Sequence, residues 1–225
     1  MNEHKDIRTS IAADPELDRL HTHVAGVMDD DPGHDITHVL RVAHWTVQIG
    51  SDADVDTREA IAAALLHDIV NVPKNSPDRK RASALCADAA TELLPGFGFD
   101  PVATARIADA ILTHSFSRGE VPRSPLGEAL QDADRLEAVG VIGVFRTIST
   151  GTLMGAKYFD SSDPWAAKRP LDDYAFSIDH FFTKLLTLHE TMRTAAGRAE
   201  AKRRTQFLEV TLDQLAIELG APRTR

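Results

Sequence analysis

The chain has 225 residues and a formal charge of −9, because 34 acidic residues outnumber 25 Lys and Arg. Apolar residues make up 43% and charged residues 26% of the sequence, which excludes a disordered chain. The acidic balance also argues against a nucleic-acid-binding protein, since no basic stripe offsets it.

Helical periodicity dominates the chain, and we expect an all-α fold because no strand alternation of useful length appears. Asp14-Pro15, Asp35 and Asp56 have the residue types that begin helices. The first helix is expected to carry the apolar stripe Leu17, Leu20, Val24 and Val27. The expected helices cover about 14–29, 35–50, 56–68, 82–94, 101–114, 126–138 with a kinked continuation over 139–149, and 178–219 with a break near Gly197. A long loop lies between them at about 151–176.

The length suits a single domain, 1–225, with a core at about 15–150 and C-terminal helices at about 177–219. A lone cysteine, Cys86, excludes an intrachain disulfide, and its Ala-rich helix favours a packing role. The polar N-terminus lacks a signal-peptide core, and the apolar runs 60–66 and 139–145 are too short to cross a membrane. We therefore expect a cytoplasmic protein that binds no membrane and no nucleic acid.

His67 and Asp68 end the helix that is apolar on all sides over 60–66, so they are expected beside the protein core. A carboxylate there is costly unless it is paired or bound to a cation. For the pair alone, a core histidine with an Asp bonded to backbone is the simpler interpretation.

A second group, His34, Asp35, His38 and Arg41, has helical spacings of three and four that place its members on one face. Two histidines four apart can bind a metal. Alternatively, His34 follows Pro32-Gly33 and is an ordinary loop histidine.

Further candidates are Asp132, Asp134 and His114. The two acids lie about 200° apart on a helix, so only one of them can face a given site. The apolar neighbours do not decide which, and a solvated acidic turn is the simpler interpretation. His114 completes the stripe Ile107, Ala110 and Ile111, as either a core histidine or a site residue.

Together these residues are more specific than any one group. His38, His67, Asp68 and one later Asp come from three helices and form a nitrogen and oxygen ligand set. Such sets suit manganese, iron, magnesium or zinc, with imidazole disfavouring magnesium, and helix bundles build metal sites in this way.

The ordered set His38…His67-Asp68…Asp134 resembles the H…HD…D signature of the HD-domain metal-dependent phosphohydrolase superfamily. The segments HDITHVLRV, ALLHDI, ILTHSFS and DADRLEAVGVIGVFRT are similar to its bacterial nucleotide pyrophosphohydrolases. The resemblance covers about residues 15–215 and implies an HD-domain helical bundle with an extended C-terminal helical segment. This chain departs from that branch at two places. It has Glu137 where the branch commonly has Asp, and its loop 71–77 is a variant. Both differences bear on the choice of substrate.

The resemblance implies that His38, His67, Asp68 and Asp134 bind the metal, leaving Asp132 behind the ligands or on the helix surface. The implied catalytic residues are Asp68, His34, Asp35 and His114. Mn²⁺ is the first expectation for the ion, with Mg²⁺, Fe²⁺, Ni²⁺ or Zn²⁺ as alternatives.

Basic residues that could bind substrate phosphate are harder to place, and for each of them a surface charge or a structural pair is the simpler interpretation. Lys74 and Arg79 follow the HD pair, and Arg41 lies one turn from His38. Further candidates are Arg135, Arg146 and Lys184.

The expected reaction is metal-dependent hydrolysis of a nucleoside triphosphate to monophosphate and pyrophosphate. A phosphomonoesterase acting on nucleoside monophosphates, a metal- or nucleotide-binding module without turnover, and a helical protein with structural histidines are the alternatives. The expected partner is a small phosphate ester, with a homodimer left open.

Overall fold

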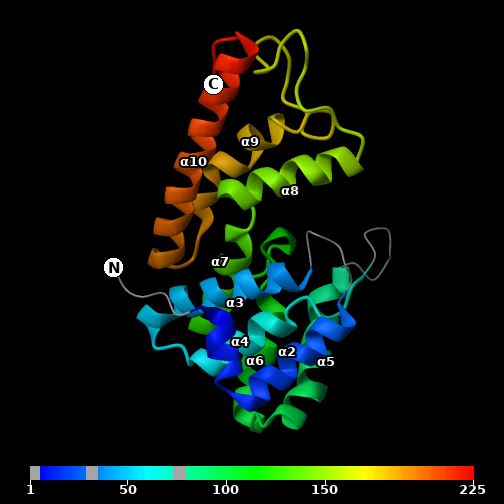
Figure 1. The fold of residues 1–225 in the computed structure, drawn as a ribbon, viewed down its shortest axis with the longest axis vertical. Helices are drawn as coiled ribbons and strands as arrows, with labels where there is room; N and C mark the ends of the chain where they lie inside the picture. Colours follow the sequence, from blue (N-terminus) through cyan, green and yellow to red (C-terminus); the bar gives the residue numbers. More distant parts are fainter. Residues whose placement is uncertain (1–5, 29–34, 73–79) are drawn as a thin grey trace. The chain divides into compact units, whose positions relative to one another are not determined.

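A computed structural model describes residues 6–28, 35–72 and 80–225, and over these residues the fold is all-α, as predicted (Figure 1). The α-helices are α1 (Ile7–Ala12), α2 (Pro15–Val27), α3 (Ile36–Gly50), α4 (Thr57–Leu66), α5 (Ala82–Leu93), α6 (Pro101–Thr113), α7 (Pro125–Leu136), α8 (Gly140–Leu153), α9 (Asp179–Thr183) and α10 (Ala195–Leu219). Short 3₁₀ helices given in full by the described residues are η1 (Ser51–Ala53), η3 (Leu94–Phe97), η4 (Phe116–Arg118) and η5 (Leu185–Thr191). The β-type pairing in the described residues is an isolated parallel bridge between Lys157 and Phe176.

The chain forms two compact units, residues 1–134 and 135–225. The boundary falls in the last turn of α7. The N-terminal unit therefore contains α1 to α6 and most of α7, whereas the C-terminal unit contains α8, α9, η5 and α10.

Helix α4 is central to the N-terminal unit. It packs against α2, α3, α5 and α6, and every residue from Ala60 to Leu66 is buried. A helix that is apolar on all sides needs neighbours on all sides, so the prediction of a buried central helix is confirmed. Cys86 is also buried, in α5, as a packing role predicts.

Among the described residues, aspartate side chains begin five helices of this unit. Asp14, Asp35 and Asp56 are at the positions that the sequence predicts, and Asp6 and Asp100 begin α1 and α6. Asp14, Asp35, Asp56 and Asp100 each accept at least one hydrogen bond from a backbone N–H in the first helical turn. These bonds satisfy donors that the helix itself leaves open. Because Asp35 and Asp56 begin α3 and α4, they help to fix the elements that carry His38 and His67.

Two details of the prediction are wrong. Helix α4 ends at Leu66, so His67 is its C-cap and Asp68 lies beyond it. Val27 is 53% exposed, although Leu17, Leu20 and Val24 of the same stripe are buried as expected. Val27 is the last residue of α2.

In the C-terminal unit, the expected kinked continuation of α7 is a separate helix, α8. It begins at Gly140, whose φ of +76° favours glycine, and runs to Leu153 rather than Ser149. The expected break near Gly197 instead precedes α10, at 192–194, and Gly197 lies in the first turn of α10. There the Gly197 N–H donates to the Thr194 hydroxyl over 2.9 Å.

The long loop is held by a buried ion pair. Asp179 is fully buried, and its carboxylate accepts hydrogen bonds from the Arg169 guanidinium and from the Asp172 backbone N–H. The guanidinium also lies 4.3 Å above the Phe176 ring. These contacts bring both sides of the loop onto the start of α9.

Within the described part of the chain, no single helix is long and apolar enough to cross a membrane. Only α7 and α8 taken together, as a bent pair, reach the required length and hydropathy.

The cap of α4 gives a test of the packing account. Replacing Asp56 by Ala removes the acceptor that lies 2.9 Å from the Glu59 backbone nitrogen. We expect the free energy of unfolding to fall by about 1 kcal/mol, measured by urea denaturation.

Asp88 is the matched control because it is exposed inside α5, where Ala is a good helix former. Asp88→Ala should change the free energy of unfolding by less than ~0.5 kcal/mol. An equal loss in the two variants would contradict a specific role for the Asp56 cap.

Candidate metal centre

Three buried histidines lie at helix termini inside the N-terminal unit. His38 is in the first turn of α3, whereas His67 and His114 are the C-caps of α4 and α6. His38 and His67 are fully buried and His114 is 5% exposed. The three helices therefore bring these imidazoles to one region of the unit.

The three rings form a row with His67 in the middle. The His67 ring centroid lies 5.4 Å from that of His38 and 5.2 Å from that of His114. The sequence placed these residues on different helices, and the structure brings all three together.

Backbone carbonyls fix the orientation of two of the rings. His67 Nδ1 lies 2.7 Å from the Ala64 carbonyl oxygen, and His114 Nδ1 lies 2.6 Å from that of Ile111. A carbonyl can only accept, so both Nδ1 atoms carry a proton. In the neutral ring, the lone pair is then on Nε2, the atom that a metal or a transferred proton would use.

The environment of His114 favours the neutral ring. Burial, together with the neighbouring His67, lowers the pKa of His114 below its ordinary value, although Asp68 and Asp134 oppose that shift. The imidazole is therefore neutral at pH 7 and can accept a proton.

Two carboxylates border the imidazoles and are each about one-third exposed. Asp134 Oδ1 lies 3.7 Å from His38 Nε2. Asp68 Oδ2 lies 3.5 Å from His67 Nε2, and its Oδ1 lies 3.9 Å from His114 Nε2. Buried imidazole nitrogen atoms and partly exposed carboxylate oxygens thus lie 3.5 to 3.9 Å apart.

This donor set fits a divalent cation. One ligand atom each from His38, His67 and Asp134 lies within 4.8 Å of the other two. The buried His67 Nε2 has no hydrogen bond among the described residues. Such a group costs about 1–3 kcal/mol unless a ligand compensates it. Imidazole nitrogen with carboxylate oxygen suits Mn²⁺, Fe²⁺ or Zn²⁺.

Asp35 orients the start of α3. Its Oδ1 accepts from the His38 backbone N–H over 2.9 Å and from the Thr37 hydroxyl over 2.7 Å. The Thr37 hydroxyl in turn accepts from Arg41 Nη1 over 3.0 Å. Burial alone would raise the pKa of Asp35, but these hydrogen bonds and the Arg41 charge lower it. Asp35 is therefore an ionised cap that holds His38 in place.

Gln131 is a supporting residue to which the sequence analysis gave no role. Its side-chain NH₂ donates to the Thr113 and Glu120 carbonyls over 3.2 and 3.0 Å. These bonds join α7, one turn before Asp134, to the end of α6 beside His114. No sequence signal singles it out, because the stretch 129–136 has as many polar as apolar residues.

The acid pair separates as helical geometry predicts. Asp134 borders the histidines, whereas Asp132 is fully buried. The alternative that Asp132 lies on the helix surface is wrong, because the residues of α7 around it are buried as well.

The predicted phosphate-binding residues are divided between the two units. Arg41 lies on α3 with His38, but Arg146 and Lys184 belong to the C-terminal unit. Arg135 is buried and donates to the Thr191 carbonyl over 2.7 Å, which gives it a structural role in place of the phosphate contact considered above. Three predicted residues lie outside the described ranges: His34, Lys74 and Arg79.

Comparison with known proteins finds a family match for the part of the chain that contains these residues. The HD domain family model matches residues 35–139. An uncharacterized protein from Bacillus subtilis, YpgQ, is 32% identical over 210 residues, which cover 91% of this chain and 94% of YpgQ.

Several solved structures have a similar fold. The crystal structure of B. subtilis YpgQ in complex with ADP has a TM-score of 0.70 at 30% identity, and covers 90% of this chain and 94% of that one. A predicted HD-superfamily hydrolase from an uncultured Thermotogales bacterium has a TM-score of 0.66 at 27% identity, over 95% and 99% of the two chains. A Bacillus thuringiensis HD-superfamily hydrolase has a TM-score of 0.68 at 26% identity, over 96% and 100%. The sequence signature, the helical fold and these relatives together show that the chain belongs to the HD-domain family.

Proposed function

We propose that this protein is a divalent-metal-dependent phosphohydrolase that cleaves a nucleoside triphosphate into a monophosphate and pyrophosphate. The observation that carries the proposal is the group of His38, His67 and Asp134, whose donor atoms lie within 4.8 Å of one another. The nucleotide class is supported by the similarity to YpgQ, which was solved in complex with ADP.

Four side chains would hold the ion: His38, His67, Asp68 and Asp134. Asp68 joins the set because its Oδ2 lies 3.5 Å from His67 Nε2. Mn²⁺ is the first candidate for this ion. The alternatives are Mg²⁺, Fe²⁺, Ni²⁺ and Zn²⁺. When bound, such an ion supplies Lewis-acid chemistry, since it lowers the pKa of water and polarises a phosphoryl oxygen.

His114 is the proposed proton acceptor, and Asp68 is the catalytic carboxylate beside it. Water attacks the α-phosphorus while the bond to the α,β-bridging oxygen breaks, so that pyrophosphate leaves. The released proton passes to the neutral Nε2 of His114, which Asp68 Oδ1 faces over 3.9 Å. The carboxylate stabilises the imidazolium that forms.

Other residues position these groups or bind substrate. Asp35 acts through His38, which it holds at the start of α3. Arg41 is the proposed phosphate contact on the same helix, and its bond to Thr37 limits its motion. Three further candidates rest on the sequence alone: Lys74 and Arg79 for binding substrate phosphate, and His34 for catalysis near the metal.

The acid pair on α7 supplies the sharpest test of the ligand set. Asp134→Asn keeps the side-chain shape but removes the charge that faces His38, so Mn²⁺ affinity should fall severely. Asp132→Asn, on the same helix, should weaken Mn²⁺ binding by only ~10–100-fold, as changes behind metal ligands do.

Isothermal titration with Mn²⁺ measures both variants, with circular dichroism as the check of folding. If Asp132→Asn abolishes binding while Asp134→Asn retains it, the proposed assignment of the ligand on α7 is wrong.

Hydrolysis should depend strictly on the metal. Exhaustive chelation should abolish turnover of nucleoside triphosphates and Mn²⁺ should restore it. His67→Ala should lose bound metal and turnover together, because it removes the central ring of the row. His23→Ala is the matched control, because His23 is exposed on α2. This variant should keep its bound metal and its turnover.

Chromatographic identification of the products distinguishes the alternatives. Monophosphate with pyrophosphate supports the proposal. Orthophosphate released from a monophosphate substrate would replace it with a phosphomonoesterase. Metal-dependent nucleotide binding without any product would indicate a binding module, and full activity after chelation would contradict the metal mechanism.

A further inference from the structure

An apolar groove of about 490 Å³ lies in the C-terminal unit, where α8 packs against α10. Its lining is mostly aromatic and aliphatic, and comes from α8, α10, the long loop and the segment around α9. Three of the lining residues are 44–62% exposed: Tyr158, Phe207 and Val210. Single exposed apolar residues need no explanation, but several of them around one groove mark an interaction surface.

The outer face of α10 continues this surface along the helix. A seam of exposed positions, spaced alternately by four and three residues, consists of Arg203, Phe207, Val210, Gln214 and Ile217. A different stripe of α10 faces its own unit and is buried: Ala201, Thr205, Leu208 and Leu212. Alternating spacings of four and three are typical of helices that pack lengthwise against another helix. One stripe of α10 therefore serves the core, and the outer seam has the pattern of a second helix contact.

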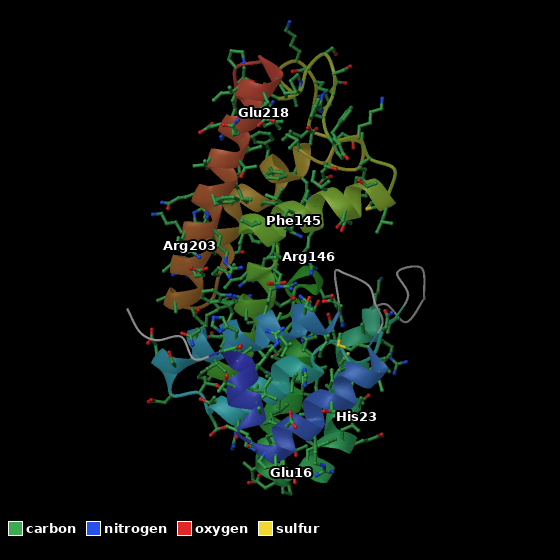
Figure 2. The ribbon with its side chains drawn as sticks, viewed as in Figure 1. Glu16, His23, Phe145, Arg146, Arg203 and Glu218 are labelled. Atoms are coloured by element: carbon green, nitrogen blue, oxygen red, sulfur yellow. The ribbon has the colours of Figure 1, made fainter. Side chains whose placement is uncertain are left out.

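The charges beside this seam indicate which helix fits it. Arg203 and Glu218 lie toward opposite ends of α10, with Val210 near the midpoint between them (Figure 2). The Arg203 side chain is 69% exposed, although Glu200 of the same helix accepts from it over 2.7 Å.

Two copies of α10 that run antiparallel would bring the Arg203 of each copy beside the Glu218 of the other. A parallel arrangement would bring like charges together, which is unfavourable. The charge pattern is therefore complementary to itself in one orientation, with a two-fold axis near Val210.

We propose that the groove and the outer seam of α10 form a two-fold interface with a second copy of this chain. The two α10 helices pack antiparallel in this interface, and the exposed apolar side chains of each copy cover those of the other. Gln214 is a polar residue within the seam and donates to Glu218 over 2.9 Å. A polar residue in such a seam favours one register. Because a two-fold contact uses the same surface on both copies, it closes as a dimer.

Sedimentation equilibrium of the full chain tests the surface, and the wild type is expected to be a dimer. Val210→Glu should raise the Kd of the dimer about 100-fold or more, because two like charges would meet at the axis. Val210 is 62% exposed, so circular dichroism should show that the variant remains folded.

A charge exchange tests the antiparallel orientation. Arg203→Glu and Glu218→Arg should each raise the Kd about 10-fold, and the double variant should return to within about threefold of the wild type. The two positions are ~22 Å apart along one helix, so this recovery would report a contact between copies.

Lys202→Glu is the matched control for the charge reversal. Lys202 is exposed, lies about 100° around the helix from Arg203 and is outside the groove lining. This variant should leave the Kd within about twofold of the wild type.

A wild type that stays monomeric at every protein concentration overturns the proposal and leaves the groove to a different protein. A dimer whose Kd is unchanged by Val210→Glu has its interface elsewhere, which also overturns it. A double variant that is no better than either single variant rejects the antiparallel orientation. None of these measurements involves metal or turnover, so their outcome is independent of the proposed function.

Discussion

Two hydrogen bonds from histidine rings to main-chain carbonyls determine what the candidate metal centre can bind. His67 and His114 each direct Nδ1–H at a carbonyl of their own helix, at 2.7 and 2.6 Å. Each bond fixes the tautomer and points Nε2 away from the helix. Both bonds go to a carbonyl three residues earlier, in the last turn of helices that end at Leu66 and Thr113.

The rest of the N-terminal unit can be understood as support for this arrangement. The residues of α4 from 60 to 66 are buried, and so is His67 at its end, whereas the neighbouring Asp68 is partly exposed. Asp35 fixes the first turn of α3 around His38, and Gln131 joins α7 to the end of α6. Rigid surroundings of this kind allow buried imidazoles to remain close together, which would be costly if they were protonated.

The sequence predicts much of this site because its signals are local. Asp residues at helix starts, an apolar stretch over 60–66 and the helical spacing of Asp132 and Asp134 all follow from short-range geometry. The ordered histidine and aspartate set added the ligand assignment, which periodicity alone left open between the two acids of α7.

Other features depend on contacts between distant residues and could not be predicted in this way. Arg135 resembled a phosphate contact, yet it binds Thr191, 56 residues further along the chain. Ser177 and Gly151 meet only after the loop returns to α8, so no spacing rule could have paired them.

Anomalous diffraction from crystals grown with Mn²⁺, recorded at the manganese absorption edge, tests the central claim most directly. The account predicts one strong peak bonded to Nε2 of His38 and His67 and to carboxylate oxygens of Asp68 and Asp134. A peak at other residues, coordination through Nδ1 of His67, or no peak at saturating Mn²⁺ would contradict it.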